Sequence, residues 1–138
     1  MKKYDFLFVC SANVGRSQIA EGFYNYYTGG KNSISAASLK DVGAQYNFKP
    51  HYLITKVMLE KGINISSFNV KMLKKEMIRS AKKIIVFCLP EQCPHYLRTS
   101  PKTTFKYCKD PANAKNKLST FRKTRDQLKR EILKLLTQ

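Results

Sequence analysis

A cysteine, an arginine and a serine lie close together in residues 10–17, which read CSANVGRS. Most side chains in this segment are small, so its successive backbone N–H groups can turn inward and form a nest for an anion. Arg16 adds a planar guanidinium, whose donors match two oxygens of a bound oxyanion. The segment therefore predicts a binding loop for a tetrahedral oxyanion such as a phosphate ester. Its members are Cys10, Ser11, Ala12, Asn13, Val14, Gly15, Arg16 and Ser17.

Cys10 is the residue of this loop that can act as a nucleophile. A helix is expected to start directly after the loop, which would place the positive end of its dipole beside the sulfur. With Arg16 also nearby, this field favours the thiolate over the thiol. Ser17 is spaced to donate its hydroxyl hydrogen to the sulfur, and Asn13 tolerates the left-handed backbone that a tight loop can require. A cysteine alone at a strand end is more often structural, and here its neighbours favour catalysis.

Three other residues that could do chemistry follow predicted strands later in the chain. Cys88 closes the apolar segment 84–88, Cys93 lies five residues further on, and Asp110 follows the segment 104–107. The chain has four cysteines and no recognisable secretory signal, so we expect reduced thiols. Zinc ligation would need a second pair of ligands at a matching spacing, which the sequence lacks, so we expect no metal.

Strands and helices alternate along the chain. Two of the expected strands are continuous apolar runs, which are typical of strands buried on both faces of a parallel sheet. The sequence predicts strands at 6–9, 34–38, 84–88 and 104–107, an extended segment at 63–65, and helices at 19–27, 50–62, 71–79 and 117–136.

This alternation indicates an α/β fold, a three-layer sandwich with a central, mostly four-stranded parallel sheet and helices on both faces. Ligands of such sheets bind beyond the carboxyl ends of the strands. Cys10, Cys88 and Asp110 should therefore meet at one edge of the sheet.

Composition is consistent with a single domain over residues 1–138, because 43% of the residues are hydrophobic and this length suits one packed core. We find no apolar run long enough to cross a membrane and no signal peptide, so a cytoplasmic protein without membrane contact is expected. The net charge of +17 favours acidic partners or phosphorylated substrates, or simply a solvated surface. Nucleic acid is an unlikely partner because no recognition motif is present.

Residues 9–21, VCSANVGRSQIAE, resemble the low molecular weight protein tyrosine phosphatase family, and the resemblance extends over nearly the whole chain. It implies that Cys10 is the nucleophile and Arg16 the phosphate clamp, with Ser35 bracing the loop. Asp110, in a Lys-Asp-Pro sequence, would protonate the leaving oxygen and then activate water. The resemblance implies hydrolysis of a phosphorylated protein or small phosphate ester through a phosphocysteine, without a cofactor.

Two departures from the phosphatase pattern stand out. Ala112 and Asn113 follow the Asp-Pro sequence, where phosphatases of this family often carry aromatic residues that flank phosphotyrosine. Gly15 precedes the arginine, where many members have a second cysteine. Other aromatic residues that could supply the missing wall are Tyr46, Phe48 and Tyr96.

Residues 16–22, RSQIAEG, also resemble the thioredoxin-coupled arsenate reductases, which share the loop. That resemblance implies a thiol relay from Cys10 to Cys88 to Cys93, with thioredoxin or another thiol reductant as partner. The spacing between Cys88 and Cys93 is shorter than in those reductases, and Pro90 and Pro94 stiffen the segment.

We therefore favour the phosphatase interpretation and keep arsenate reductase as the alternative. A basic module that binds nucleic acid or acidic protein, with the loop serving only as an anion nest, is a more distant alternative.

Overall fold

The computed structural model describes residues 2–113, 115 and 117–138. In these residues four strands form one sheet in the order β2-β1-β3-β4, and every neighbouring pair is parallel. The strands are β1 (Tyr4–Cys10), β2 (Ser33–Ala37), β3 (Ala81–Val86) and β4 (Thr103–Phe105). The predicted α/β sandwich with a four-stranded parallel sheet is confirmed.

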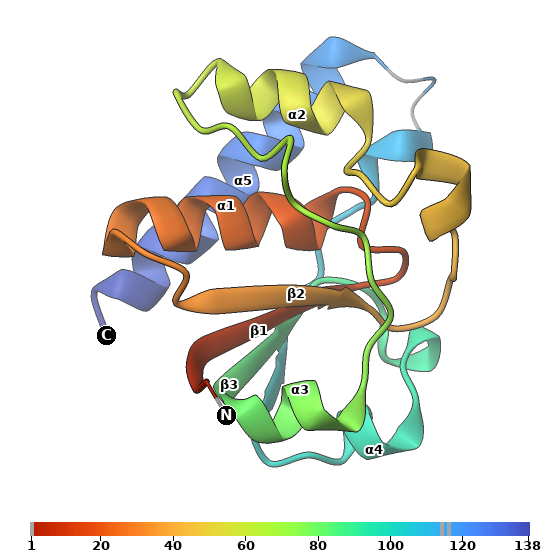
Figure 1. The fold of residues 1–138 in the computed structure, drawn as a ribbon, viewed down its shortest axis with the longest axis vertical. Helices are drawn as coiled ribbons and strands as arrows, with labels where there is room; N and C mark the ends of the chain where they lie inside the picture. Colours follow the sequence, from red (N-terminus) through yellow and green to blue (C-terminus); the bar gives the residue numbers. More distant parts are fainter. Residues whose placement is uncertain (1, 114, 116) are drawn as a thin grey trace.

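Helices cover both faces of the sheet, with α1, α2 and α5 on one side and α3 and α4 on the other (Figure 1). The α-helices are α1 (Arg16–Thr28), α2 (Tyr52–Leu59), α3 (Lys75–Ser80), α4 (His95–Arg98) and α5 (Leu118–Leu136). Three short 3-10 turns are η1 (Gly43–Tyr46), η2 (Pro90–Gln92) and η3 (Pro111–Asn113).

The burial of strand β1 on both faces explains why its residues 6–9 are apolar at every position rather than at alternate positions. Phe6 and Phe8 pack into the core beneath α1, α2 and α5, whereas Leu7 and Val9 pack into the core on the opposite face. Successive side chains of a strand point to opposite faces, so a strand covered on both faces needs apolar residues at every position. Helix α5 covers its face of the sheet with Phe121, Leu128 and Ile132, which are buried.

The register of the strands aligns their carboxyl ends. Val9 pairs with Val86, and Val86 pairs with Phe105. The loop after β1 and the segments that follow β3 and β4 therefore leave the sheet at the same edge (Figure 1).

The predicted helix at 71–79 is only partly correct, because α3 begins at Lys75. Residues 71–73 instead run beside the end of β2, where Met72 forms a bridge with Ala37. The backbone N–H of Ala37 donates to Lys71, and that of Leu73 donates to Ala37, both at 2.8 Å. This tertiary pairing covers the edge of β2 and overrides local helix propensity. Residues 63–65, predicted as extended, belong to no strand.

Within the residues described, no helix combines the length and the apolar character needed to span a membrane.

Candidate active site

The loop at residues 10–15 connects β1 to α1 and is held from outside through its carbonyl groups. Ser38 N–H donates to the Cys10 carbonyl at 2.9 Å, and His51 N–H donates to the Val14 carbonyl at 2.9 Å. The Ser11 carbonyl accepts from two backbone N–H groups of the segment after β2, at 3.1 and 2.8 Å. The end of β2 and the start of α2 therefore fix the path of the loop.

The amide groups of the same loop are left available. Among the described contacts, no backbone N–H of residues 11–15 donates to another protein atom. The N-terminus of α1 begins at Arg16 and adds the unpaired amides of its first turn. Successive free amides next to a helix N-terminus form an anion-binding site.

Asn13 stabilises the loop from inside. Its backbone is left-handed, with φ of 61°, and its side chain is fully buried. The amide oxygen accepts from the backbone N–H of Lys71 at 3.0 Å, which fixes the amide orientation because a backbone N–H can only donate. The Asn13 amide nitrogen then donates to Ser17 Oγ at 2.7 Å and to Ser35 Oγ at 3.0 Å.

This network orients the Ser17 hydroxyl group, which lies next to the Cys10 sulfur. Cys10 Sγ and Ser17 Oγ lie 3.0 Å apart. Because Ser17 Oγ already accepts from Asn13, its own hydrogen is free to point at the sulfur. Ser17 is therefore positioned to donate to a Cys10 thiolate.

A partly buried carboxylate, that of Glu21, lies behind the loop. Ser35 accepts from Asn13 and donates to Glu21 at 2.6 Å, and Lys71 Nζ lies 4.0 Å from the Glu21 carboxylate. Burial raises the pKa of Glu21, against the lowering effects of Lys71 and Ser35. Burial also disfavours the charged form of Lys71 and so lowers its pKa, and the charge of the nearby Glu21 partly offsets this effect. Ser35 thus links the loop to a paired charge in the interior.

Arg16 is buried, with 4% of its surface exposed. Its Nη1 donates to the carbonyls of Phe87 at 3.2 Å and Cys108 at 2.8 Å, and its Nη2 donates to Ser11 Oγ at 3.2 Å. The guanidinium is thereby held at the carboxyl ends of the strands rather than in bulk water. Its Nη2 also lies 3.9 Å from the carboxylate of Asp110.

A cavity of about 170 Å³ opens at this edge. It brings together the loop, the Asp110 carboxylate and the segment after β3. Its lining residues are Ser11, Arg16, Lys40, Leu89, Gln92, Tyr107, Lys109 and Asp110. The Asp110 side chain is 35% exposed, and its Oδ1 accepts from the Ala112 N–H at 3.0 Å. The loop, Arg16 and Asp110 therefore converge on one polar opening.

Sequence reasoning missed several residues of this opening, which are Lys40, Leu89, Gln92, Tyr107 and Lys109. Tyr107 supplies an aromatic ring before the Asp-Pro sequence, whereas Tyr46 and Tyr96, the sequence-based candidates for this role, are not among the lining residues. Phe48 lines a neighbouring hollow that shares Lys40 with this cavity. The position of Tyr107 two residues after the end of β4 was the available signal, because ligands of such sheets bind beyond the carboxyl ends of the strands.

Cys88 and Cys93 lie together beside the cavity. Their sulfurs are 3.8 Å apart, and both residues are buried. The hydrogen bond from Cys93 is the main effect that lowers the pKa of Cys88, to about 6; burial opposes it, while Ser38 and Arg16 lower it further. The same hydrogen bond raises the pKa of Cys93. Within the pair, this contact favours ionisation of Cys88 over ionisation of Cys93.

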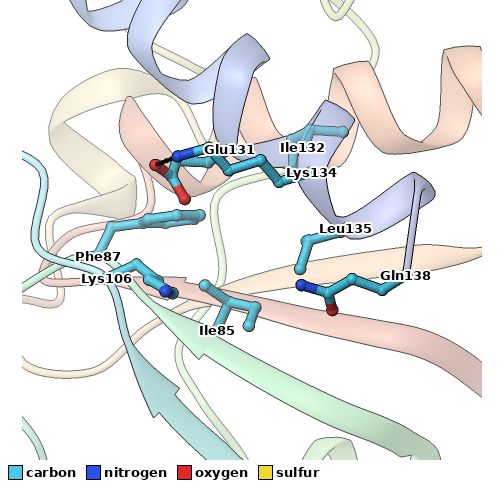
Figure 2. Close-up of a pocket in the computed structure, with 8 residues that line it drawn as sticks. All are labelled: Ile85, Phe87, Lys106, Glu131, Ile132, Lys134, Leu135 and Gln138. Carbon is cyan, nitrogen blue, oxygen red and sulfur yellow. Dashed lines mark hydrogen bonds and ion pairs between the residues drawn. The ribbon is translucent and has the colours of Figure 1, made fainter.

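Other hollows and thiols are less suited to chemistry. Figure 2 shows a smaller cavity of about 50 Å³ between α5 and the sheet, where Ile85, Phe87 and Leu135 face a Glu131–Lys134 ion pair. None of the expected site residues lines it. Cys108 is buried, and burial raises its pKa to about 11, which makes it a poor nucleophile.

Comparison with known proteins agrees with this architecture. The arsenate reductase 1 of Staphylococcus epidermidis is 28% identical over 134 residues, which cover 96% of this chain and 95% of the relative. The structure of a low molecular weight protein tyrosine phosphatase from T. tengcongensis superposes with a TM-score of 0.79 at 25% identity, covering 98% of this chain and 99% of that one. The thioredoxin-dependent arsenate reductase of Corynebacterium glutamicum shares the fold (TM-score 0.74, 24% identity), covering 99% of this chain and 61% of that one.

Residues 5–138 match the family described as low molecular weight phosphotyrosine protein phosphatase. The match spans the oxyanion loop, the cysteine pair and the Asp-Pro sequence. The chain therefore belongs to the low molecular weight phosphotyrosine protein phosphatase family, an enzyme superfamily whose relatives include arsenate reductases.

Proposed function

We propose that this protein is an arsenate reductase that uses Cys10, Cys88 and Cys93 in sequence. The observation that carries the proposal is the 3.8 Å separation of the Cys88 and Cys93 sulfurs, in a segment whose Leu89 and Gln92 line the oxyanion cavity. Hydrolysis of a phosphate ester needs neither thiol. A reductase needs both, because two electrons must pass from thiols to the bound oxyanion.

In the first step the Cys10 thiolate attacks arsenic(V) in arsenate, and a sulfur–arsenic bond forms. One arsenic–oxygen bond breaks, and the oxygen leaves as water after protonation, for which Asp110 is positioned at the mouth of the cavity. The amides of residues 11–15 and the Arg16 guanidinium stabilise the charge on the remaining oxygens.

In the second step the Cys88 thiolate attacks Cys10 Sγ. A Cys10–Cys88 disulfide forms while the sulfur–arsenic bond breaks, and its electron pair reduces arsenic(V) to arsenite. Cys93 then gives up its proton and attacks Cys88, which releases Cys10 as a thiolate and leaves a Cys88–Cys93 disulfide. A dithiol protein of the thioredoxin class returns the two electrons.

The short spacing of the two cysteines does not keep them apart. The 3-10 turn η2 (Pro90–Gln92) folds the segment back, and its Cys93 N–H donates to Pro90 at 3.0 Å. The turn that begins at Pro90 therefore also holds the sulfurs near each other. The name of the S. epidermidis relative, arsenate reductase 1, supports the same activity.

Phosphatase activity is the second candidate, and Asp110 favours it. Its carboxylate lies 3.9 Å from Arg16 in the same cavity as the loop, where it can protonate the leaving oxygen of a phosphate ester. The absence of aromatic residues directly after Asp-Pro in the sequence favours a small oxyanion over a phosphotyrosine side chain, although Tyr107 offers one ring.

One side-by-side assay tests the proposal. The purified protein is given arsenate with thioredoxin, thioredoxin reductase and NADPH, and separately an aryl phosphate. Sustained NADPH oxidation that needs Cys88 and Cys93 supports the reductase. Aryl phosphate turnover with no arsenate-dependent NADPH oxidation would reject the reductase in favour of the phosphatase. Cys108→Ala is the matched control, because it removes a buried thiol outside the relay.

A further inference from the structure

Ser38 connects the nucleophile loop to the cysteine pair. Its backbone N–H donates to the Cys10 carbonyl at 2.9 Å. Its side-chain oxygen lies 2.8 Å from the carbonyl of Gln92, to which it donates, and 3.4 Å from Cys88 Sγ. A serine hydroxyl carries one hydrogen, so it can serve only one of these two acceptors at a time.

Cys93 meets the same restriction. Its single S–H faces the Leu89 carbonyl at 3.7 Å and Cys88 Sγ at 3.8 Å. Both carbonyls belong to the turn that covers the pair, because Leu89 and Gln92 bound η2. Two hydrogens are thus each shared between the Cys88 sulfur and a carbonyl of this turn.

We propose that Ser38 is a positioning residue whose hydroxyl group turns its hydrogen bond from the Gln92 carbonyl to the Cys88 sulfur when Cys88 becomes a thiolate, which loosens the turn at residues 89–92. In the thiol form, Cys88 S–H donates to Ser38 Oγ, and Ser38 donates to Gln92. In the thiolate form, Ser38 O–H and Cys93 S–H both donate to the sulfur. The Gln92 carbonyl then loses its side-chain donor, and the Leu89 carbonyl keeps only the Gln92 N–H at 2.9 Å.

The exchange requires only rotation about side-chain bonds, because both acceptors of each hydrogen are already within reach. Its consequence falls on the active-site cavity, which Leu89 and Gln92 line. Ionisation of Cys88 therefore prepares the sulfur and at the same time loosens part of the cavity wall next to it. For its place in turnover the proposal rests on the arsenate reductase function.

Few charged groups act on this pair in the described residues. The positive charge of Arg16, from α1, favours the Cys88 thiolate. Arg98, at the end of α4, acts in the same direction on Cys93. Both guanidinium groups stay charged through the range in which a thiol titrates, so a pH profile between 5 and 8 reports on Cys88 itself.

The test is the pH dependence of Cys88 alkylation by iodoacetamide, measured by peptide mapping in the reduced full-length protein. In Ser38→Ala the midpoint should move upward by about one unit, which lowers the rate at pH 5.5 by about eightfold. Ser38→Thr keeps a hydroxyl and should restore the midpoint. Ser80→Ala is the matched control, because Ser80 donates to the Met77 carbonyl and has no contact with the pair in the described structure.

An unchanged midpoint in Ser38→Ala would overturn the proposal, and so would a shift that Ser38→Thr fails to reverse. Hydrogen exchange provides a second readout at the amides of Gln92 and Cys93, normalised to those of α5. Protection in the wild type should fall as Cys88 ionises, and Cys88→Ala should show no such step. A step that persists in Cys88→Ala would contradict the coupling.

Neither measurement uses arsenate. If the protein fails to reduce arsenate but the Ser38 effect is observed, the proposed function is rejected and the proposed role of Ser38 is retained. If the protein reduces arsenate but the Ser38 effect is absent, the proposed function is retained and the proposed role of Ser38 is rejected.

Discussion

The loop at residues 10–17 and the turn at residues 88–93 face the same cavity, but they are stabilised in different ways. In the loop, one chain of hydrogen bonds orients the side chains around Cys10, because the Lys71 N–H fixes the Asn13 amide and that amide donates to Ser17. In the turn, the hydrogens of Ser38 and Cys93 each have two acceptors.

The difference separates two tasks. A nucleophile that attacks a bound oxyanion benefits from a rigid surround that is already oriented before the reaction. A thiol that must later attack the nucleophile needs a surround that can rearrange. We infer that the rigid region does the binding and the first attack, and that the adaptable region does the electron transfer.

The largest expected effect is that of Cys10→Ser, which removes the step that both candidate activities share. Arsenate reduction and aryl phosphate hydrolysis should each fall by at least about 10³-fold, while arsenate still binds, as measured by calorimetry. Appreciable turnover of either substrate would remove Cys10 from the nucleophile role.

Cys93→Ser should affect the two candidate activities differently, because only the reductase needs the turn at residues 88–93. Arsenate reduction should stop after the first turnover, because the Cys10–Cys88 disulfide would have no thiol to resolve it. Hydrolysis of an aryl phosphate, where the protein catalyses it, should change less than twofold, as a rough limit. Continued NADPH oxidation in the thioredoxin assay would show that the turn is not part of the relay.

Asp110→Asn tests the mouth of the cavity. Aryl phosphates with poor leaving groups should lose about 100-fold in kcat, because no carboxyl protonates the departing oxygen. Those with good leaving groups should lose much less. A plot of rate against leaving-group pKa gives the answer, and equal losses would exclude Asp110 as the general acid.

Asn13→Ala should have the smallest effect, and it falls on stability. The change leaves Ser17 and Ser35 without a donor and the Lys71 N–H without an acceptor, at a cost of about 2 to 3 kcal/mol in unfolding free energy. Urea titration measures it. Asn64→Ala is the control, because Asn64 is exposed and accepts only from the local Ser66 N–H in the described structure. Equal destabilisation by both changes would show that the Asn13 network does not stabilise the loop more than a local surface contact does.

The parts of this protein that follow local rules were predictable from the sequence. The apolar run at residues 6–10 has no other stable place than a doubly covered strand, and a small-residue loop between a strand and a helix carries free amides wherever it occurs. The fold and the convergence of Cys10, Cys88 and Asp110 on one edge followed from these features.

The parts that depend on distant pairing were not predictable. Residues 71–73 have a helical pattern, yet Met72 pairs with Ala37, and only the fold brings the two together. Nothing local marks Ser38 as a neighbour of Cys88, since 50 residues separate them. The closeness of Cys88 and Cys93 was not predictable for the same reason, because spacing alone does not show how η2 brings the sulfurs near each other.

The central claim is that the turn supplies two electrons to an oxyanion bound in the loop. A single-turnover experiment without reductant tests it most directly, by measuring arsenite released and free thiols remaining among the four cysteines. We predict one arsenite per chain, the loss of two thiols and a Cys88–Cys93 disulfide in the peptide map. Four intact thiols and no arsenite, from protein that binds arsenate, would contradict the account.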